Sequence, residues 1–216
     1  GVEDDDILFT AANQLNLGGP ESITGNQSQI VIVANLNLRA GKKAMEMSDF
    51  GAAYSYFDYG ISFLRKNHWK EHYSLSLELF NLAAKCALTN GDIDSLNLLS
   101  EQVLRMTRSF EDTLYVRFYK MCALAFSSKL PESIEKGLDI LSKLGIELRG
   151  CESRGMAACV QETTDLLSAF TDDEILNTRR MTDPTMIMAM SMDELAASEA
   201  ITGMDWPRTP AFWNRN

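Results

Sequence analysis

The sequence lacks the features that mark membrane, secreted and nucleic-acid-binding proteins. No apolar run approaches the roughly 20 residues that a membrane-spanning helix needs, and the N-terminus shows no secretory pattern. Lys and Arg number 20 against 30 Asp and Glu, which gives a net charge of −10. Because an acidic surface repels phosphate backbones and anionic lipid, we expect neither nucleic acid nor a membrane as a partner.

Proline and cysteine are also scarce. Five prolines in 216 residues argue against a disordered or loop-dominated chain. The four cysteines form no C-x-x-C pair, so neither a zinc knuckle nor a thioredoxin-type site is indicated. Cys86 and Cys122 fall inside apolar helical stretches, where we expect them to be reduced core residues. This cysteine usage favours a cytoplasmic protein.

What the sequence does contain, from about residue 29 to 145, is apolar residues at three- and four-residue spacing. This spacing is typical of amphipathic helices. The one β-like stretch, Gln29 to Val33, runs on into further apolar residues, so we predict it to be buried helix. Ser48-Asp49 and Asn90-Gly91-Asp92 have the composition of helix ends and N-caps, and Pro131 that of a first helical turn. The sequence therefore predicts an all-α fold.

Small residues recur at fixed distances inside these helices. Ala53, Leu96 and Ile134 lie 43 and then 38 residues apart, and a small residue stands twelve positions before each of them. The small residues are Gly41, Ala84 and Cys122. Tetratricopeptide repeats need small residues where two antiparallel helices touch, although their regular period is about 34 residues. We therefore predict tetratricopeptide-like helical hairpin repeats, an α-solenoid, with an irregular helical bundle as the alternative.

These patterns predict four segments along the chain. Thr171 and Glu174 have the spacing of a capping box, and a methionine-rich helix is expected to begin at Asp183-Pro184 and end before Gly203. The predicted segments are an N-terminal helix and loop that would end a preceding accessory domain (1–28), three helix pairs (29–145, divided as 29–67, 71–108 and 111–145), additional helices (146–203) and an irregular tail (204–216).

One catalytic motif is nearly present. His68-Trp69-Lys70-Glu71-His72 fits H-x-x-E-H, the inverted zinc-peptidase pattern. It sits where one helix should end and the next begin, and these are the only two histidines, so we interpret it as a chance match. Residues 150–155 have the glycine spacing of a phosphate-binding loop, but Met156-Ala157 stands where Lys-Ser/Thr is required. We predict no catalytic residues, no metal ligands and no cofactor.

Several stretches carry a family resemblance. They include Leu36 to Ala44 (LNLRAGKKA), Tyr59 to Leu64 (YGISFL), Tyr73 to Phe80 (YSLSLELF) and Gly137 to Gly145 (GLDILSKLG). Through them the chain resembles the tetratricopeptide-like helical region that follows the ATPase module in very large multi-sensor signalling kinases with a STAND-type ATPase core. Ile7 to Gly18 is similar to the end of the last accessory domain of that ATPase. The nucleotide-binding, kinase and sensor modules of the family lie outside this segment, so the resemblance implies a part without catalytic residues.

The sequence thus predicts a noncatalytic helical-repeat module for protein interaction or regulation, a segment of a large signal-transduction ATPase-kinase. Its partner would be another protein or an adjacent domain of the larger chain. The alternatives are a structural spacer or inhibitory lid for an adjacent ATPase and, remotely, a zinc-dependent hydrolase that uses His68 and His72. Stacked helix pairs leave a groove lined by their first helices. The candidate exposed aromatics for partner binding, with core packing as the competing interpretation, are Tyr54, Tyr56, Trp69 and Tyr73.

Overall fold

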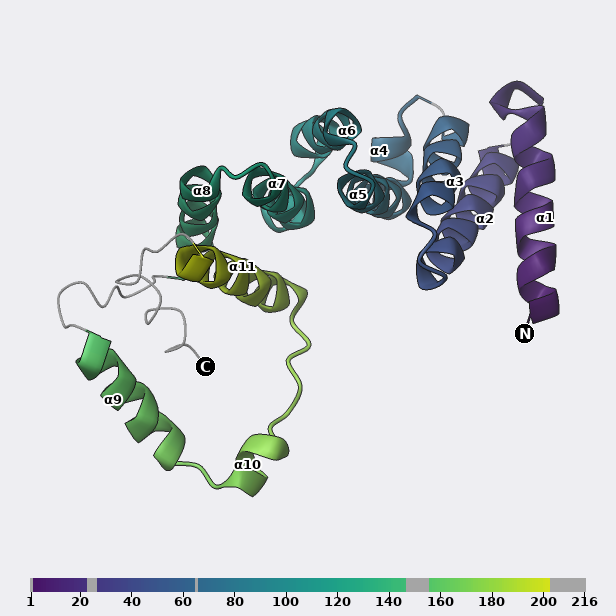
Figure 1. Cartoon of the computed structure of the whole chain (residues 1–216). Helices are drawn as coiled ribbons and strands as arrows, with labels where there is room; N and C mark the ends of the chain where they lie inside the picture. Colours follow the sequence, from purple (N-terminus) through teal and green to yellow (C-terminus); the bar gives the residue numbers. More distant parts are fainter. Residues whose placement is uncertain (1, 23–26, 65, 147–155, 203–216) are drawn as a thin grey trace. The chain divides into compact units, whose positions relative to one another are not determined.

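The computed structural model describes residues 2–22, 27–64, 66–146 and 156–202 (Figure 1). Across these ranges the chain is built from helices, and they contain no strand, which confirms the predicted all-α fold. None of the described helices combines the length and apolar character needed to cross a bilayer. The chain divides into two compact units, Gly1–Tyr119 and Lys120–Asn216.

The first unit is a succession of helices joined by short turns (Figure 1). Within it α2 packs against α1 and α3, while α5 packs against α3, α4 and α6. The last helix, α7, continues into the second unit. The elements are α1 (Val2–Gly18), the 3-10 turn η1 (Pro20–Ser22), α2 (Gln27–Glu46), α3 (Phe50–Phe63), α4 (His68–Glu71), α5 (Tyr73–Thr89), α6 (Ile93–Met106), the 3-10 turn η2 (Glu111–Thr113) and α7 (Leu114–Phe126).

The same tight turn follows α2, α5 and α7, which are the first helices of the three predicted pairs. In each turn one residue adopts a left-handed backbone, with φ of 61° at Ser48, 75° at Gly91 and 59° at Ser128. The next backbone N–H then donates back to the carbonyl oxygen five residues earlier, as Asp49 does to Ala44 over 2.9 Å. This pairing is the Schellman ending of a helix. It turns the chain back at once, so that each of the three helices is followed directly by another. The helix α8 (Leu130–Lys143) ends in the same way, with φ of 74° at Gly145 and a 2.9 Å hydrogen bond from the Ile146 N–H to the Leu141 carbonyl oxygen.

Aspartate caps begin two of the following helices. The Asp49 carboxylate accepts a hydrogen bond from the Ala52 backbone N–H at 2.9 Å, and the Asp92 carboxylate accepts one from the Ser95 backbone N–H at 3.0 Å. An oxygen at this position satisfies a backbone donor that has no partner inside the helix. These caps and the left-handed turns confirm the helix boundaries predicted at Ser48-Asp49 and Asn90-Gly91-Asp92.

Small residues let the helices of the first unit approach closely. A Cβ atom built on Gly41 would lie 2.4 Å from Cε1 of Phe57, and one built on Gly60 would lie 2.8 Å from Cδ2 of Leu79. Phe57 and Leu79 are fully buried. The buried core around them also contains Ala34, Leu38, Ala44, Ala53, Leu64, Ala83 and Cys86.

The residues that share the sequence pattern are also buried. Ala53 and Leu96 have no exposed surface, and Ile134 is buried in the second unit. Their partners twelve positions earlier are buried as well: Gly41, Ala84 and Cys122. Cys86 and Cys122 lie in buried positions, which confirms the predicted core role. The stretch Gln29 to Val33 is helical, as predicted, because it lies within α2.

The second unit contains the end of α7, α8 (Leu130–Lys143), α9 (Met156–Ser168), α10 (Asp172–Leu176) and α11 (Pro184–Thr202). Within it α8 packs against α11. The Ser133 hydroxyl donates to the backbone carbonyl oxygen of Met121 at 3.0 Å, which ties α8 to α7. The predicted capping box at Thr171 and the helix start at Pro184 are confirmed. The predicted tail (204–216) and residues 147–155 of the predicted helical segment lie outside the described residues.

Candidate functional site

Trp69 is a core residue, so the structure agrees with the core-packing interpretation of its ring rather than with an exposed one. Only 5% of its surface is accessible. Its ring centroid lies 5.0 Å from that of Phe80 and 6.0 Å from that of Tyr73. The short helix α4, which carries Trp69, packs against α5 and brings the indole into contact with that helix. The sequence places no apolar neighbour beside Trp69 that would have revealed this packing.

Tyr54 and Tyr56 are half-buried on α3 and pack against its core. The Tyr56 hydroxyl donates to Oδ1 of Asn13 at 2.9 Å, and its ring stacks on Phe9 with centroids 5.7 Å apart. Tyr56 therefore holds α1 against α3. A role for Tyr54 or Tyr56 in binding a partner stays a prediction.

Tyr73 joins the start of α5 to the segment before α7. Its hydroxyl donates to Oδ2 of Asp112 at 2.5 Å and accepts the backbone N–H of Arg108 at 2.9 Å. The Arg108 guanidinium lies 4.1 Å from the ring centroid, in a cation–π arrangement. Burial and the hydrogen bond to the Asp112 carboxylate raise the pKa of Tyr73. The side chain therefore acts as a clasp between two elements, and its partner-binding role stays a prediction.

The two histidines of the H-x-x-E-H match have separate structural positions. His68 begins the single turn α4, and His72 follows its last residue with an extended φ of −132°. Nδ1 of His68 lies 2.8 Å from the Ser76 hydroxyl, which itself donates to the His72 carbonyl oxygen. Because that hydroxyl proton is used, Nδ1 of His68 is the donor to Ser76. Burial, and then the charge of His72, lower the pKa of His68.

Among the described residues, no group of three or more His, Cys, Asp or Glu side chains is placed to hold a metal ion. The His68 ring instead stacks on Phe80 with centroids 6.0 Å apart. The structure therefore gives His68 a packing role at the junction between α3 and α5.

A buried amide pair that sequence reasoning missed joins α1 to α2. Nδ2 of Asn16 donates to Oδ1 of Asn37 at 2.8 Å, and Nδ2 of Asn37 donates back to Oδ1 of Asn16 at 2.9 Å. Asn37 has no exposed surface, and Asn16 has 7%. The sequence feature that could have revealed the pair is Asn37 itself, a polar residue between Leu36 and Leu38 at a core position of an apolar helix. Reciprocal pairing of this kind fixes one register between two helices.

The largest polar surface in the first unit lies on the outward sides of α2 and α5. We call it the first-helix face. It consists of Asn35, Arg39, Lys42, Glu78, Asn81 and Lys85. Lys42 of α2 and Glu78 of α5 form an ion pair of 2.5 Å across the two helices, with about half of each side chain exposed. Such a pair adds little stability, but it shows that both helices present these residues to the same side.

The first-helix face also has one unsatisfied acceptor and an excess of positive charge. Oδ1 of Asn81 is buried and has no hydrogen-bond partner among the described residues. Arg39, Lys42 and Lys85 outnumber Glu78 here, in a chain whose net charge is −10.

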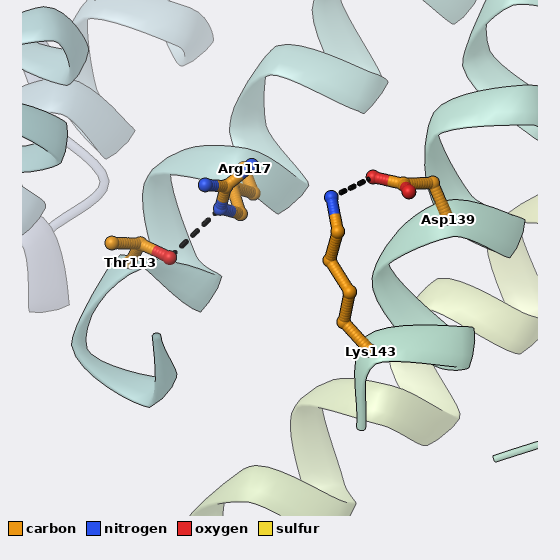
Figure 2. Close-up of polar contacts among 4 residues, drawn as sticks. All are labelled: Thr113, Arg117, Asp139 and Lys143. Atoms are coloured by element: carbon orange, nitrogen blue, oxygen red, sulfur yellow. Dashed lines mark hydrogen bonds and ion pairs between the residues drawn. The ribbon is translucent and has the colours of Figure 1, made fainter. Parts of the chain in front are cut away.

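Other basic side chains are held by internal contacts. Lys43 lies 3.1 Å from Oδ2 of Asp5 and 3.2 Å from Oε2 of Glu46, and its hydrogen bonds to these carboxylates, that to Asp5 foremost, raise its pKa. Figure 2 shows two further cases. Nε of Arg117 donates to Oγ1 of Thr113 at 2.8 Å in the first unit, and Lys143 pairs with Asp139 in the second.

Comparison of the chain with protein-family models, with curated proteins and with solved structures finds no match in any of the three. The likeness to the helical region of STAND-type ATPase kinases therefore stays a prediction. Functional reasoning rests on the described residues themselves, above all on the recurrent turns and the first-helix face.

Proposed function

We propose that this chain is a noncatalytic helical-repeat module of tetratricopeptide-like hairpins. Its role would be protein interaction or regulation, and its partner would be a separate protein or an adjacent domain of a large signalling ATPase-kinase. The first-helix face is the proposed contact surface.

The recurrent turn is the single observation that carries the proposal. Three times, a left-handed residue and a backbone hydrogen bond spanning five residues reverse the chain after a helix. Small or apolar residues six or seven positions before these turns and five or six positions after them are buried: Gly41, Ala84 and Cys122 before them, and Ala53, Leu96 and Ile134 after them. A helical-repeat protein requires the same local structure to recur along the chain, as this turn and its buried neighbours do here.

The composition of the first-helix face supports a protein partner. Packing of α2 and α5 uses their opposite sides, where Leu38, Ala44, Leu79 and Ala83 lie in the core. The outward sides therefore keep polar groups that the fold does not need, including Arg39 and Lys85. Charged and amide groups held on rigid helices provide specificity in a polar protein interface.

A structural spacer or inhibitory lid for an adjacent ATPase remains the second candidate. Its supporting observation is that Tyr56, Trp69 and Tyr73 make internal contacts that stiffen the first unit. A spacer needs such rigidity but needs no binding surface of its own. The two functions therefore differ in whether the isolated chain binds another protein.

The discriminating experiment is affinity capture from a lysate of the source cells. The immobilised 216-residue chain is compared with a charge-matched helical protein as the control. A protein that is retained saturably by the chain and not by the control supports the interaction module. Equal retention on both columns, or retention on neither, contradicts it and favours the spacer or lid.

A further inference from the structure

Helix α11 carries apolar side chains on two sides, but its packing explains only one of them. Met188, Ala189 and Met192 are 8%, 1% and 0% exposed, on the helix that packs against α8. The remaining side carries exposed apolar residues: Met186, Ile187 and Met190, at 39%, 45% and 45%. A cluster of exposed large apolar residues on one side of a helix commonly marks a contact surface. We call this second side the outer face of α11.

The segment before α11 exposes its apolar side chains instead of burying them. Every described side chain of residues 156–176, which form α9 and α10, is exposed. Five of them are large and apolar: Leu166, Leu167, Phe170, Ile175 and Leu176, which are 45% to 81% exposed. An amphipathic helix gains most of its stability from packing its apolar side. This segment therefore has an apolar surface to cover and, as it stands, no packing partner for it.

Local hydrogen bonds extend the helical turn of α9 to Phe170 and start α10 at Thr171, and we call these two helices together the arm. The Phe170 backbone N–H donates to the Leu167 carbonyl oxygen at 3.1 Å, so the helical turn continues past Ser168. The capping box then starts α10 directly, with the Thr171 backbone N–H donating to Glu174 at 2.8 Å. Leu166, Leu167 and Phe170 consequently move together.

The chain between the arm and α11 permits closure. Residues 177–183 are exposed and lie outside any helix. At about 3.3 Å per residue they reach roughly 20 Å, which exceeds the ~8–10 Å between the axes of packed helices. A short tether also gives the arm an effective concentration on the order of millimolar at α11, well above that of a free partner.

From these observations we propose that the arm closes onto the outer face of α11, packing Leu166, Leu167 and Phe170 against Met186, Ile187 and Met190. The side chains of both faces are exposed in the structure, and the closed arrangement would be a second state of the same unit. Methionine suits such a reversible contact, because its unbranched side chain adapts to different neighbours. A molecule that binds α11 from outside must displace the arm, so closure regulates access to this face.

Photo-crosslinking in the full-length chain tests the proposal. A benzoylphenylalanine replaces Met190, and the adducts are mapped by mass spectrometry at several protein concentrations. We expect adducts within one chain to residues 162–176, with a yield that does not depend on concentration. Leu166→Asp with Leu167→Asp should lower that yield by roughly tenfold or more, because two apolar contacts are lost and two charges would be buried.

The matched control adds the same charge to the other side of α9, as Gln161→Asp with Ser168→Asp, and should leave the yield unchanged. Both positions are exposed, so neither pair of changes disturbs the packed core, and circular dichroism checks that the helices persist. Three outcomes overturn the proposal. They are adducts only between two chains, which would make a second copy the occupant, no adducts to the arm, or an equal loss in both double variants.

Discussion

Asn16 and Asn37 show how a single buried polar pair can set the position of a whole helix. Each amide both donates to and accepts from the other, and Asn37 also donates to the Val33 carbonyl oxygen at 3.1 Å. Neither residue gains from burial itself, because amides lose hydration in an apolar surrounding. They contribute through their two mutual hydrogen bonds, and both bonds form only when α1 packs against α2 in one register.

Replacing one member of this pair should cost more than replacing both. We expect Asn37→Leu to lower the free energy of unfolding by about 1–3 kcal/mol, because Asn16 is left buried without its partner. The double change Asn16→Leu with Asn37→Leu should recover much of that loss. A double-mutant cycle by urea unfolding measures the coupling. Simple addition of the two single losses would show that the pair is not coupled.

Gly41 is required by close packing rather than by backbone conformation. An added Cβ atom would lie 2.4 Å from the buried Phe57 ring, so we expect Gly41→Ala to destabilise the fold by about 1–3 kcal/mol through overpacking. Gly51→Ala on α3 is the control, because its nearest neighbour, a carboxylate oxygen of Asp49, is 3.7 Å away. That change should stabilise the helix by up to about 1 kcal/mol. Thermal unfolding of both variants checks the difference in sign.

His68 should make stability depend on pH. Burial, and secondarily the charge of His72, lower its pKa in the folded state below the ordinary value of about 6.5. The unfolded chain therefore binds a proton first as the pH falls, and stability decreases from about pH 6.5 downward until the folded-state pKa is passed. Above that range His68 is neutral in both the folded and the unfolded state, so it adds no dependence of stability on pH.

The assignment to His68 can be checked with its neighbour. His68→Gln should flatten the fall in unfolding free energy, measured by urea titration at several pH values. His72→Gln should keep most of it, because burial of His68 is the larger cause and remains. An unchanged pH profile in His68→Gln would place the dependence on other groups.

At the scale of elements, the three helix-ending turns differ in one respect. Gly91 occupies the left-handed position in one of them, whereas Ser48 and Ser128 occupy it in the other two with φ of 61° and 59°. A side chain in this conformation costs roughly 1–2 kcal/mol, which glycine avoids. The two serine turns therefore hold strain that the glycine turn does not.

Glycine should consequently stabilise the serine turns. We expect Ser48→Gly or Ser128→Gly to raise the free energy of unfolding by about 1 kcal/mol. Ser142→Gly, at an exposed helical position of α8, is the control and should lower it by about 0.5 kcal/mol. Chemical denaturation compares the three. Destabilisation by all of them would mean that the left-handed turn is not the ending of these helices.

The Tyr73 clasp joins elements that are distant in the sequence. Tyr73→Phe removes the hydrogen bond to Asp112 and the acceptor for the Arg108 backbone N–H, at a cost of about 1–2 kcal/mol. We expect faster amide hydrogen exchange in residues 107–113 and little change within α2. Tyr59→Phe, on an exposed tyrosine, should change neither region. Equal protection in the Tyr73 variant would show that the clasp does not hold this segment.

Helix boundaries could be predicted because their causes are local. Asp49, Gly91 and Thr171 act on backbone groups within a few residues of themselves, so their chemistry is visible in the sequence. The short helix α4 was not predicted, and α3 ends at Phe63, before the predicted end of the first helix pair at residue 67. Both depend on how the chain folds back toward α5, which is a tertiary property.

For the whole molecule, the sequence predicted the class of fold but not which aromatics it would use. Trp69 packs under α5, and Tyr56 and Tyr73 contact Asn13 and Asp112 from other parts of the chain. Contacts over such separations leave no local signal, so exposure could not be predicted from helical spacing. The first-helix face emerges only when α2 and α5 both pack against α3, which brings Lys42 within ion-pair distance of Glu78.

The two units divide the proposed roles between them. The first unit carries the first-helix face on a stiff array of helices, while the second carries α11 and the arm. Partner binding on the first unit and closure of the arm in the second rest on different residues. A failure of one leaves the other to be tested by itself.

The most direct test of the central claim is to locate the partner contact by charge reversal. A protein captured by the chain is titrated against Arg39→Glu with Lys85→Glu, and against Lys66→Glu with Arg105→Glu as a control of equal charge outside the face. We predict that the first pair weakens binding by roughly 10-fold or more, about 1.4 kcal/mol or above, while the control remains near wild type. Equal affinities for all three proteins would contradict the claim that the first-helix face is the binding surface.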